Sequence, residues 1–359
     1  MSSTTITTTL TSTGGESRST GILKLRGHEE DHFPELKTRG WTVVKNVIPP
    51  LKAREYEDRA YRWLESFGKG FDKDDRSTWK PDNLPWFAKG GLFNRHGAAH
   101  EQWAWDIRSE EGIIDTFAKI WGTDELLVSY DGVNVSLPFK NEDLGDRGEP
   151  WPHVDQSPNR TGKECIQGIA NLAPNGPKDG GLMILDGSFP LYNQYFEEHQ
   201  HLKPSDGWDW RDSYSYPEET LEWFYSKGCK WVKIEAGPGD LILWDSRTVH
   251  YGAHAEGDRP RVATCLAGTG SDDDDIFELE TDMCRIDVCY KPAEGISPER
   301  MGLRKTALED YSGTSHDPIN FRLTGTNVAG PLSPDEKQLP KQPAVLSERA
   351  KKLAGVVAY

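Results

Sequence analysis

The chain has 359 residues, a formal net charge of −16 and 35% hydrophobic residues, enough for one large domain with extensions or two small domains. The acidic balance argues against a nucleic-acid partner, because neutralising phosphates needs clustered Lys and Arg. No stretch approaches the length of a membrane span, and the five Cys form no CxxC pair, so we expect no membrane association and a reducing, cytoplasmic location.

The first part of the chain predicts a tail followed by helices. Residues 1–22 are rich in Ser and Thr and are predicted to be disordered. The run "GWTVVKNVIPP" (40–50) is typical of a short strand that ends at two prolines. Helices are predicted at 51–68 and 111–122, where apolar residues recur on one face and a glycine closes each segment. These stripes indicate core packing, and the helical part extends to about residue 125.

From residue 126 the pattern changes to short β-rich runs separated by Gly, Pro, Asn and Asp. The runs are "LLVSYDGVNVSLP", "CIQGIANLAP", "GGLMILDG", "KWVKIEAGPGDLILW" and "RVATCLAGTG". Many short strands with turn signals between them predict a β-sandwich or barrel. From about residue 292 the chain becomes rich in Pro, Lys and Glu, and residues 292–359 are predicted to be an extension that wraps or trails the domain.

The stretch "EPWPHVDQSP" (149–158) contains a His-x-Asp pair. On an extended strand residues i and i+2 share a face, so His153 and Asp155 are expected to project together. A third ligand follows in "GPGDLILWDSRTVHYGAH" (237–254), where an apolar run delivers His250, with His254 as the alternative. Two imidazoles and one carboxylate leave three metal positions open, which is typical of non-haem Fe(II) oxygenases.

A keto acid can chelate such a metal through two positions and leave the third for dioxygen. Arg261, on the strand after His250, is a candidate clamp for the distal carboxylate of the keto acid, because its guanidinium has a forked donor face. Asn134 and Gln167 lie on strands predicted to line the barrel, and their amides are candidates for contacting cosubstrate or substrate. Gln156 adjoins Asp155 and is a candidate for orienting it.

The motifs "HVD", "GGLMILDGSF", "GDLILWDSRTVH" and "RPR" follow one another in the order and spacing of the phytanoyl-CoA dioxygenase-like Fe(II)/2-oxoglutarate oxygenases. The chain resembles that family from about residue 40 to 266. The resemblance implies an oxygenase domain over 23–291, mainly β with flanking helices, whose core at 126–291 is a double-stranded β-helix (jelly roll, cupin-like). It also implies Fe(II) bound by His153, Asp155 and His250, and 2-oxoglutarate held through its C5 carboxylate by Arg261. The sequence "GSF" at 187–189, Gly252 and Val154 depart from the family pattern.

The predicted function is a 2-oxoglutarate-dependent dioxygenase of secondary metabolism. It would oxidise an unactivated C–H bond of a small metabolite or amino-acid-like biosynthetic intermediate, with dioxygen as co-reactant. Hydroxylation is the default outcome, and desaturation or ring closure are further outcomes. Two alternatives remain at this point: a non-catalytic jelly-roll binding module, and a metal-dependent enzyme that uses the same ligands without 2-oxoglutarate. The sequence carries no signal for the oligomeric state.

Overall fold

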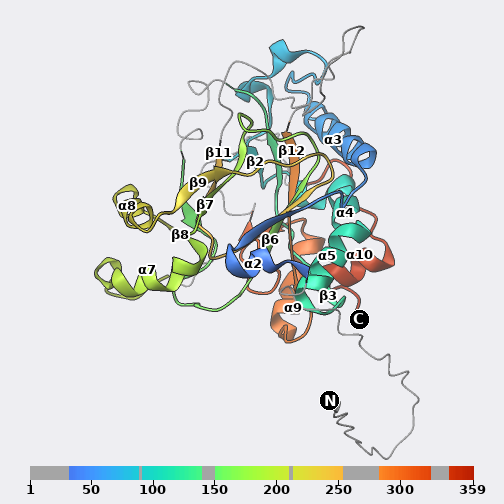
Figure 1. The fold of residues 1–359 in the computed structure, drawn as a ribbon. Coiled ribbons are helices and arrows are strands. Elements are labelled where there is room, and N and C mark those ends of the chain that lie inside the picture. Colours follow the sequence, from blue (N-terminus) through green and yellow to red (C-terminus); the bar gives the residue numbers. More distant parts are fainter. Residues whose placement is uncertain (1–31, 89–90, 140–149, 210–212, 254–282, 325–338) are drawn as a thin grey trace, which may run out of the picture.

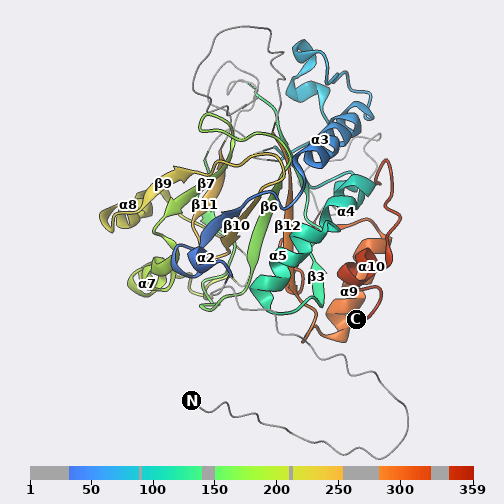
Figure 2. The same ribbon diagram turned by 45° about the vertical axis from the view of Figure 1, so that its right-hand side comes forward.

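The structure is a computed structural model that describes residues 32–88, 91–139, 150–209, 213–253, 283–324 and 339–359 (Figure 1). Two antiparallel sheets form its centre. Helices α3, α4 and α5 lie on one side with α9 and α10, while α7 and α8 lie on the opposite side (Figures 1 and 2). This arrangement confirms the predicted class, a jelly roll with flanking helices.

The larger sheet has seven strands among the described residues, in the order β1-β10-β6-β12-β4-β2, with β3 also paired to β12. Its strands are β1 (Trp41–Val44), β2 (Leu92–Phe93), β3 (Leu126–Val128), β4 (Val133–Ser136), β6 (Ile166–Asn171), β10 (Leu241–Asp245) and β12 (Met283–Pro292). The sequence pattern predicted no strand at β12, although β12 lies between β6 and β4. Charged residues interrupt the apolar pattern of this segment, which hid the strand.

The smaller sheet has five strands among the described residues, in the order β8-β5-β11-β7-β9. They are β5 (His153–Val154), β7 (Gly181–Asp186), β8 (Tyr214–Ser215), β9 (Lys230–Lys233) and β11 (His250–Ala253). Between β7 and β9 the chain forms α7 (Tyr192–Glu198) and α8 (Glu218–Ser226), which cover an aromatic cluster. This sheet carries the His-x-Asp segment and His250 on neighbouring strands.

Strand β10 explains how the layers are held together. Leu241 and Leu243 pack into the cluster that contains Phe117 of α5, whereas Ile242 and Trp244 pack between the sheets. Successive side chains of a strand point to opposite faces, so a strand buried on both faces is apolar throughout, as "LILW" is. The turn before β10 needs glycine at Gly239, because its φ is +87° and a Cβ there would overlap a neighbouring backbone carbonyl.

The helices on the larger sheet are α2 (Pro34–Thr38), α3 (Pro50–Glu65), α4 (Gln102–Arg108) and α5 (Glu111–Trp121). Of these four helices, α3 and α5 confirm the two predicted helices, whereas α2 and α4 were not predicted. Gly122 ends α5 in the left-handed conformation, with a φ of 70°.

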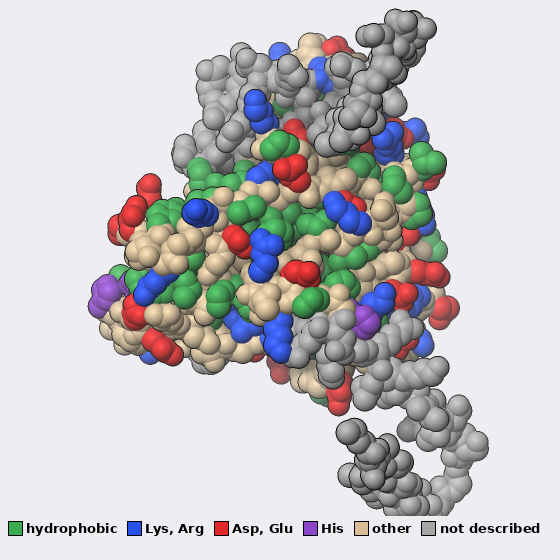
Figure 3. All heavy atoms as spheres, in the orientation of Figure 1, with side chains coloured by type: hydrophobic (Ala, Val, Ile, Leu, Met, Phe, Trp, Pro, Cys, Tyr) green, Lys and Arg blue, Asp and Glu red, His purple; other side chains and the backbone are tan. Residues whose placement is uncertain are grey.

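Lys and Arg side chains are interspersed with Asp and Glu over the face of the molecule that Figure 3 shows.

The C-terminal region packs against the jelly roll. It contains α9 (Pro298–Glu309), the two-stranded β13 (Gly313–Thr314) and β14 (Leu323–Thr324), and α10 (Glu348–Ala354). Leu353 and Ala354 are fully buried in the same core cluster as the helices of the N-terminal part. The guanidinium of Arg304, also fully buried, donates to backbone carbonyls of β3 and of α10. This region is therefore fixed to the domain where the structure describes it.

Candidate metal centre

His153 and His250 lie directly opposite each other on β5 and β11. Residues in direct register on antiparallel strands point to the same face, and the centroids of the two imidazole rings are 4.4 Å apart. His250 is almost fully buried, and β11 pairs with β7 on its other side. Regular sheet pairing therefore brings the two imidazoles together.

Asp155 reaches the same point from just beyond a strand. The sequence pattern predicted an extended strand through both His153 and Asp155, but β5 ends at Val154 and Asp155 lies in a bend. Its carboxylate is nevertheless close to both imidazoles, with Oδ2 3.1 Å from His250 Nε2 and Oδ1 3.6 Å from His153 Nε2. Ligand atoms of all three residues lie within 4.8 Å of one another, and no other group of this kind occurs among the described residues.

The donor set fits a metal ion. Nδ1 of His153 lies 2.7 Å from the Trp151 carbonyl, and Nδ1 of His250 lies 2.9 Å from the Thr248 carbonyl. A carbonyl only accepts, so each Nδ1 carries the proton and each Nε2 keeps a lone pair facing the carboxylate. Two imidazole nitrogens and a carboxylate oxygen thus converge with the tautomers that ligation requires.

The electrostatics of the site favour the same ligating forms. Burial lowers the pKa of His153 to about 4, and the neighbouring His250 adds to this effect. Burial alone would raise the pKa of Asp155, but His316 and His153 hold the pKa of this carboxyl well below its usual range. At neutral pH the pair therefore provides a neutral imidazole and a carboxylate, which are the forms that bind metal.

The triad lies in a cavity of about 210 Å³. Its apolar walls come from Leu92, Trp151, Ile169, Leu182, Trp244 and Val288. Gly252 also lines this cavity, whereas Val154 is buried in the aromatic cluster under α7 and α8. Of the departures from the family pattern, the one at Val154 is thus removed from the cavity.

The two amides predicted to contact cosubstrate or substrate also line this cavity. Gln167 Nε2 donates to Asp155 Oδ2 at 2.9 Å, so this side chain holds the carboxylate. Asn134 Oδ1 accepts a hydrogen bond from Ser136 Oγ at 3.2 Å. The prediction that Gln156 orients Asp155 is wrong. Its Nε2 donates to the Gly162 carbonyl, and its Oε1 accepts from the Ser246 hydroxyl. Gln167, which lies on β6 of the larger sheet, has the role of orienting Asp155 that was expected of Gln156.

Two predicted residues lie outside the described part of the chain, namely Arg261 and the alternative ligand His254. One residue that sequence analysis missed does reach the site. His316 lines the cavity, and its Nε2 donates to the backbone carbonyl of Asp155 at 3.0 Å. It stands 161 residues after Asp155 and belongs to no motif, so no local pattern could have indicated it.

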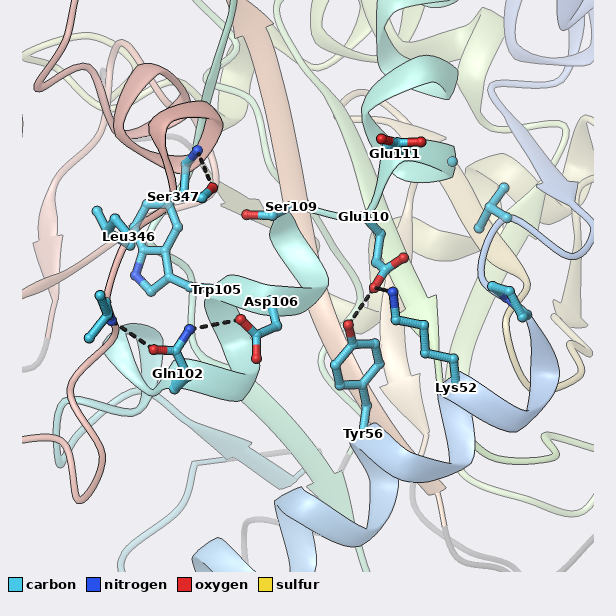
Figure 4. Close-up of a pocket in the computed structure, with 15 residues that line it drawn as sticks. Lys52, Tyr56, Gln102, Trp105, Asp106, Ser109, Glu110, Glu111, Leu346 and Ser347 are labelled. Carbon is cyan, nitrogen blue, oxygen red and sulfur yellow. Dashed lines mark hydrogen bonds and ion pairs between the residues drawn. The ribbon is translucent and has the colours of Figure 1, made fainter.

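A larger hollow of about 690 Å³ lies elsewhere, between α3, α4, the start of α5 and the C-terminal segment (Figure 4). Within it, Lys52 Nζ lies 2.6 Å from Glu110 Oε1, and Tyr56 donates to the same carboxylate. Leu346 and Ser347 of the C-terminal segment form the opposite wall. The hollow contains none of the triad, and it marks where the C-terminal segment lies against α4.

A jelly roll that gathers two imidazoles and one carboxylate in its cavity defines the class of non-haem Fe(II) oxygenases. The family model of phytanoyl-CoA dioxygenase matches residues 36–263, and the chain belongs to the phytanoyl-CoA dioxygenase family. It is 38% identical over 293 residues to "Ava biosynthesis cluster protein O" of Aspergillus versicolor. The match covers 81% of this chain and 87% of that relative. A solved structure of a hypothetical protein from Escherichia coli shares the fold, with a TM-score of 0.52, 14% identity and coverage of 90% of this chain and 81% of that chain.

Family membership decides between the alternatives that the sequence left open. The protein is an oxidoreductase whose cofactors are Fe(II) and 2-oxoglutarate. The alternatives of a non-catalytic binding module and of a metal enzyme independent of 2-oxoglutarate are therefore wrong. Within the part of the chain that the structure describes, we find no helix with the length and apolar character that crossing a membrane requires.

Proposed function

We propose that the protein oxidises an unactivated C–H bond of a small metabolite, with Fe(II) bound by His153, Asp155 and His250. The observation that carries this proposal is the convergence of three ligand atoms within 4.8 Å of one another in a small cavity between the sheets. Three protein ligands leave three metal positions open for cosubstrate and dioxygen. When bound, Fe(II) with 2-oxoglutarate and dioxygen supplies the oxidant, and the keto acid leaves as succinate and CO2.

The chain's own residues would bind the metal, orient its ligand atoms and exclude water. The hydrogen bonds of the two Nδ1 atoms to backbone carbonyls hold each Nε2 toward the metal position. Gln167 fixes one carboxylate oxygen of Asp155. Apolar side chains on the cavity wall, such as Leu182 and Ile169, would keep water from the substrate C–H bond.

The cosubstrate has three candidate contacts from the sequence. Arg261 would clamp the distal carboxylate of 2-oxoglutarate through its forked donor face. Asn134 lines the cavity and would offer its amide to the cosubstrate or the substrate. Gln167 would serve the cosubstrate only through the part of its amide that Asp155 does not use.

A small metabolite is the proposed substrate class for three reasons. The cavity of about 210 Å³ is small, and the Aspergillus versicolor relative is named for a biosynthesis cluster. The net charge of −16 also makes a polyanionic acyl-CoA thioester less suitable. Hydroxylation is the default outcome; desaturation or ring closure would depend on how the cavity holds the substrate radical.

The test is a turnover screen with Fe(II), 2-oxoglutarate and air. The panel contains amino-acid-derived metabolites and acyl-CoA thioesters, and the readouts are succinate release and product mass. We expect one or more small metabolites to stimulate succinate release and to gain one oxygen or lose two hydrogens. Stimulation confined to acyl-CoA thioesters would overturn the proposed substrate class, and failure of wild type to bind Fe(II) would overturn the metal site.

A further inference from the structure

We infer that His316, delivered by the C-terminal region, is a positioning residue that sets the Asp155 carboxylate for metal binding. The inference rests on the proposed role of Asp155 as a metal ligand. His316 Nε2 donates to the Asp155 carbonyl at 3.0 Å, and its Nδ1 lies 4.0 Å from Asp155 Oδ1. The imidazole therefore hydrogen-bonds to the backbone of Asp155 and lies beside its carboxylate.

Asp155 needs such support because it has left the sheet. Strand β5 ends at Val154, so no further strand pairing holds the Asp155 backbone. Its N–H donates to the Ser246 carbonyl at 2.9 Å, and its own carbonyl accepts from His316. Both peptide groups flanking the side chain are thereby held, and the direction of the Cα–Cβ bond is set. Removing the His316 donor leaves a partly buried carbonyl without this partner and lets the bend relax.

His316 is itself held firmly by residues on both sides of it. Thr314 donates its N–H to the Tyr130 carbonyl at 2.8 Å and accepts the Tyr130 N–H through Oγ1 at 2.9 Å. Asp317 forms an ion pair with Lys291 of β12 at 3.0 Å. Both anchors join the β13–β14 connection to the jelly roll, so the imidazole has a fixed position relative to the metal-binding residues.

The ring also lies close to the carboxylate. Because Nε2 donates to a carbonyl, Nε2 carries the proton and the ring orientation is defined. Nδ1 of the same ring then lies 4.0 Å from Oδ1. Gln167 holds the other oxygen, Oδ2. Supports of this kind behind a metal ligand commonly change metal affinity by about 10- to 100-fold when removed.

The experiment compares two variants of equal side-chain length, His316→Gln and His316→Met. Only the glutamine keeps an N–H donor near the position of Nε2. Metal-free protein is titrated with Mn(II) alone, which needs neither dioxygen nor 2-oxoglutarate. We expect Mn(II) to bind His316→Met about 10- to 100-fold more weakly than wild type, and His316→Gln to stay within about threefold of wild type.

Ser315→Ala is the matched control in the same connection. It removes the hydroxyl that accepts the Arg322 N–H at 3.0 Å and leaves His316 in place. We expect it to bind Mn(II) like wild type. Wild-type Mn(II) affinity in His316→Met would overturn the inference, and so would an equal loss of affinity in Ser315→Ala. Either result would mean that His316 does not act on Asp155 specifically.

Two further measurements keep the outcomes distinct. If Asp155→Ala binds Mn(II) as tightly as wild type, the proposed metal site fails rather than the role of His316. If His316→Met does not fold, His316→Asn replaces it, since the shorter amide cannot reach the Asp155 carbonyl. Weak Mn(II) binding by the asparagine variant beside normal binding by His316→Gln supports the inference, and equal binding by the two overturns it.

Discussion

Two of the three ligands reach the metal centre by different means. His250 lies on β11, paired with β5 on one side and β7 on the other, so regular sheet pairing positions it. Asp155 lies beyond the end of β5 and is held by Ser246, Gln167 and His316, from three separate segments. A ligand held by strand pairing needs only a local pattern, whereas a ligand in a bend depends on side chains far away in the sequence.

Removing the Asp155 carboxylate itself has the largest expected effect on the metal centre. Asp155→Ala takes away the anionic ligand and leaves two imidazoles, which hold Fe(II) poorly. We expect 2-oxoglutarate turnover to fall by roughly 1000-fold or more, as measured by succinate release. The near-ultraviolet circular dichroism should remain that of wild type. Substantial turnover in this variant would mean that another residue provides the carboxylate.

Arg304→Met tests the tether of the C-terminal region, by which we mean the buried hydrogen bonds of Arg304. This region carries His316, which supports Asp155. The buried Arg304 guanidinium donates to four backbone carbonyls, those of Val128, Pro318, Leu353 and Ala354. Losing these bonds leaves buried carbonyls short of donors, so we expect the free energy of unfolding to fall by about 4 kcal/mol in urea denaturation. Lys305→Met, on the exposed side of the same helix, should change it by less than about 0.5 kcal/mol. An equal effect of the two substitutions would contradict the tether.

Acidification tests a second contact of the C-terminal region. His100 is buried with Nε2 2.9 Å from the Ser312 carbonyl, and burial lowers its pKa from 6.5 to about 4. The unfolded chain therefore binds this proton at a higher pH than the folded protein does. The stability due to neutral His100 is complete above pH 6.5 and is lost as the pH falls toward 4.

Denaturation at pH 7.5 and pH 5 measures this loss. Wild type should lose about 2 kcal/mol more than His100→Gln between these two pH values, because the variant has no proton to gain. The glutamine keeps a donor for the Ser312 carbonyl, so the two proteins should be close at pH 7.5. Parallel losses on acidification would show that His100 does not contribute.

Gln167→Leu tests one of the three supports of Asp155 at the site itself. This variant removes the donor to Asp155 Oδ2 and puts an apolar side chain in its place. We expect Mn(II) affinity to fall by about 10-fold. Asn134→Leu, in the same cavity, should leave Mn(II) affinity unchanged. If Gln167→Leu instead raises only the KM for 2-oxoglutarate, Gln167 serves the cosubstrate and not the carboxylate.

The parts of the fold that the sequence predicts are those that depend on local pattern. The apolar run of β10, the stripe of α5 with Gly122 at its end, and the His-x-Asp pair are each visible within a few residues. Strand β12 was missed because its charged residues hide a segment that only tertiary pairing makes a strand. His316 was missed for a related reason, since its link to Asp155 exists only after the C-terminal region has folded onto the sheet.

The most direct test of the metal centre is an anaerobic titration of metal-free protein with Fe(II) and then 2-oxoglutarate, followed by visible absorption. We expect a weak charge-transfer band that needs both additions and is absent from Asp155→Ala. A wild-type protein that binds Fe(II) but gives no band with 2-oxoglutarate, or an Asp155→Ala variant with the same band, would contradict this expectation.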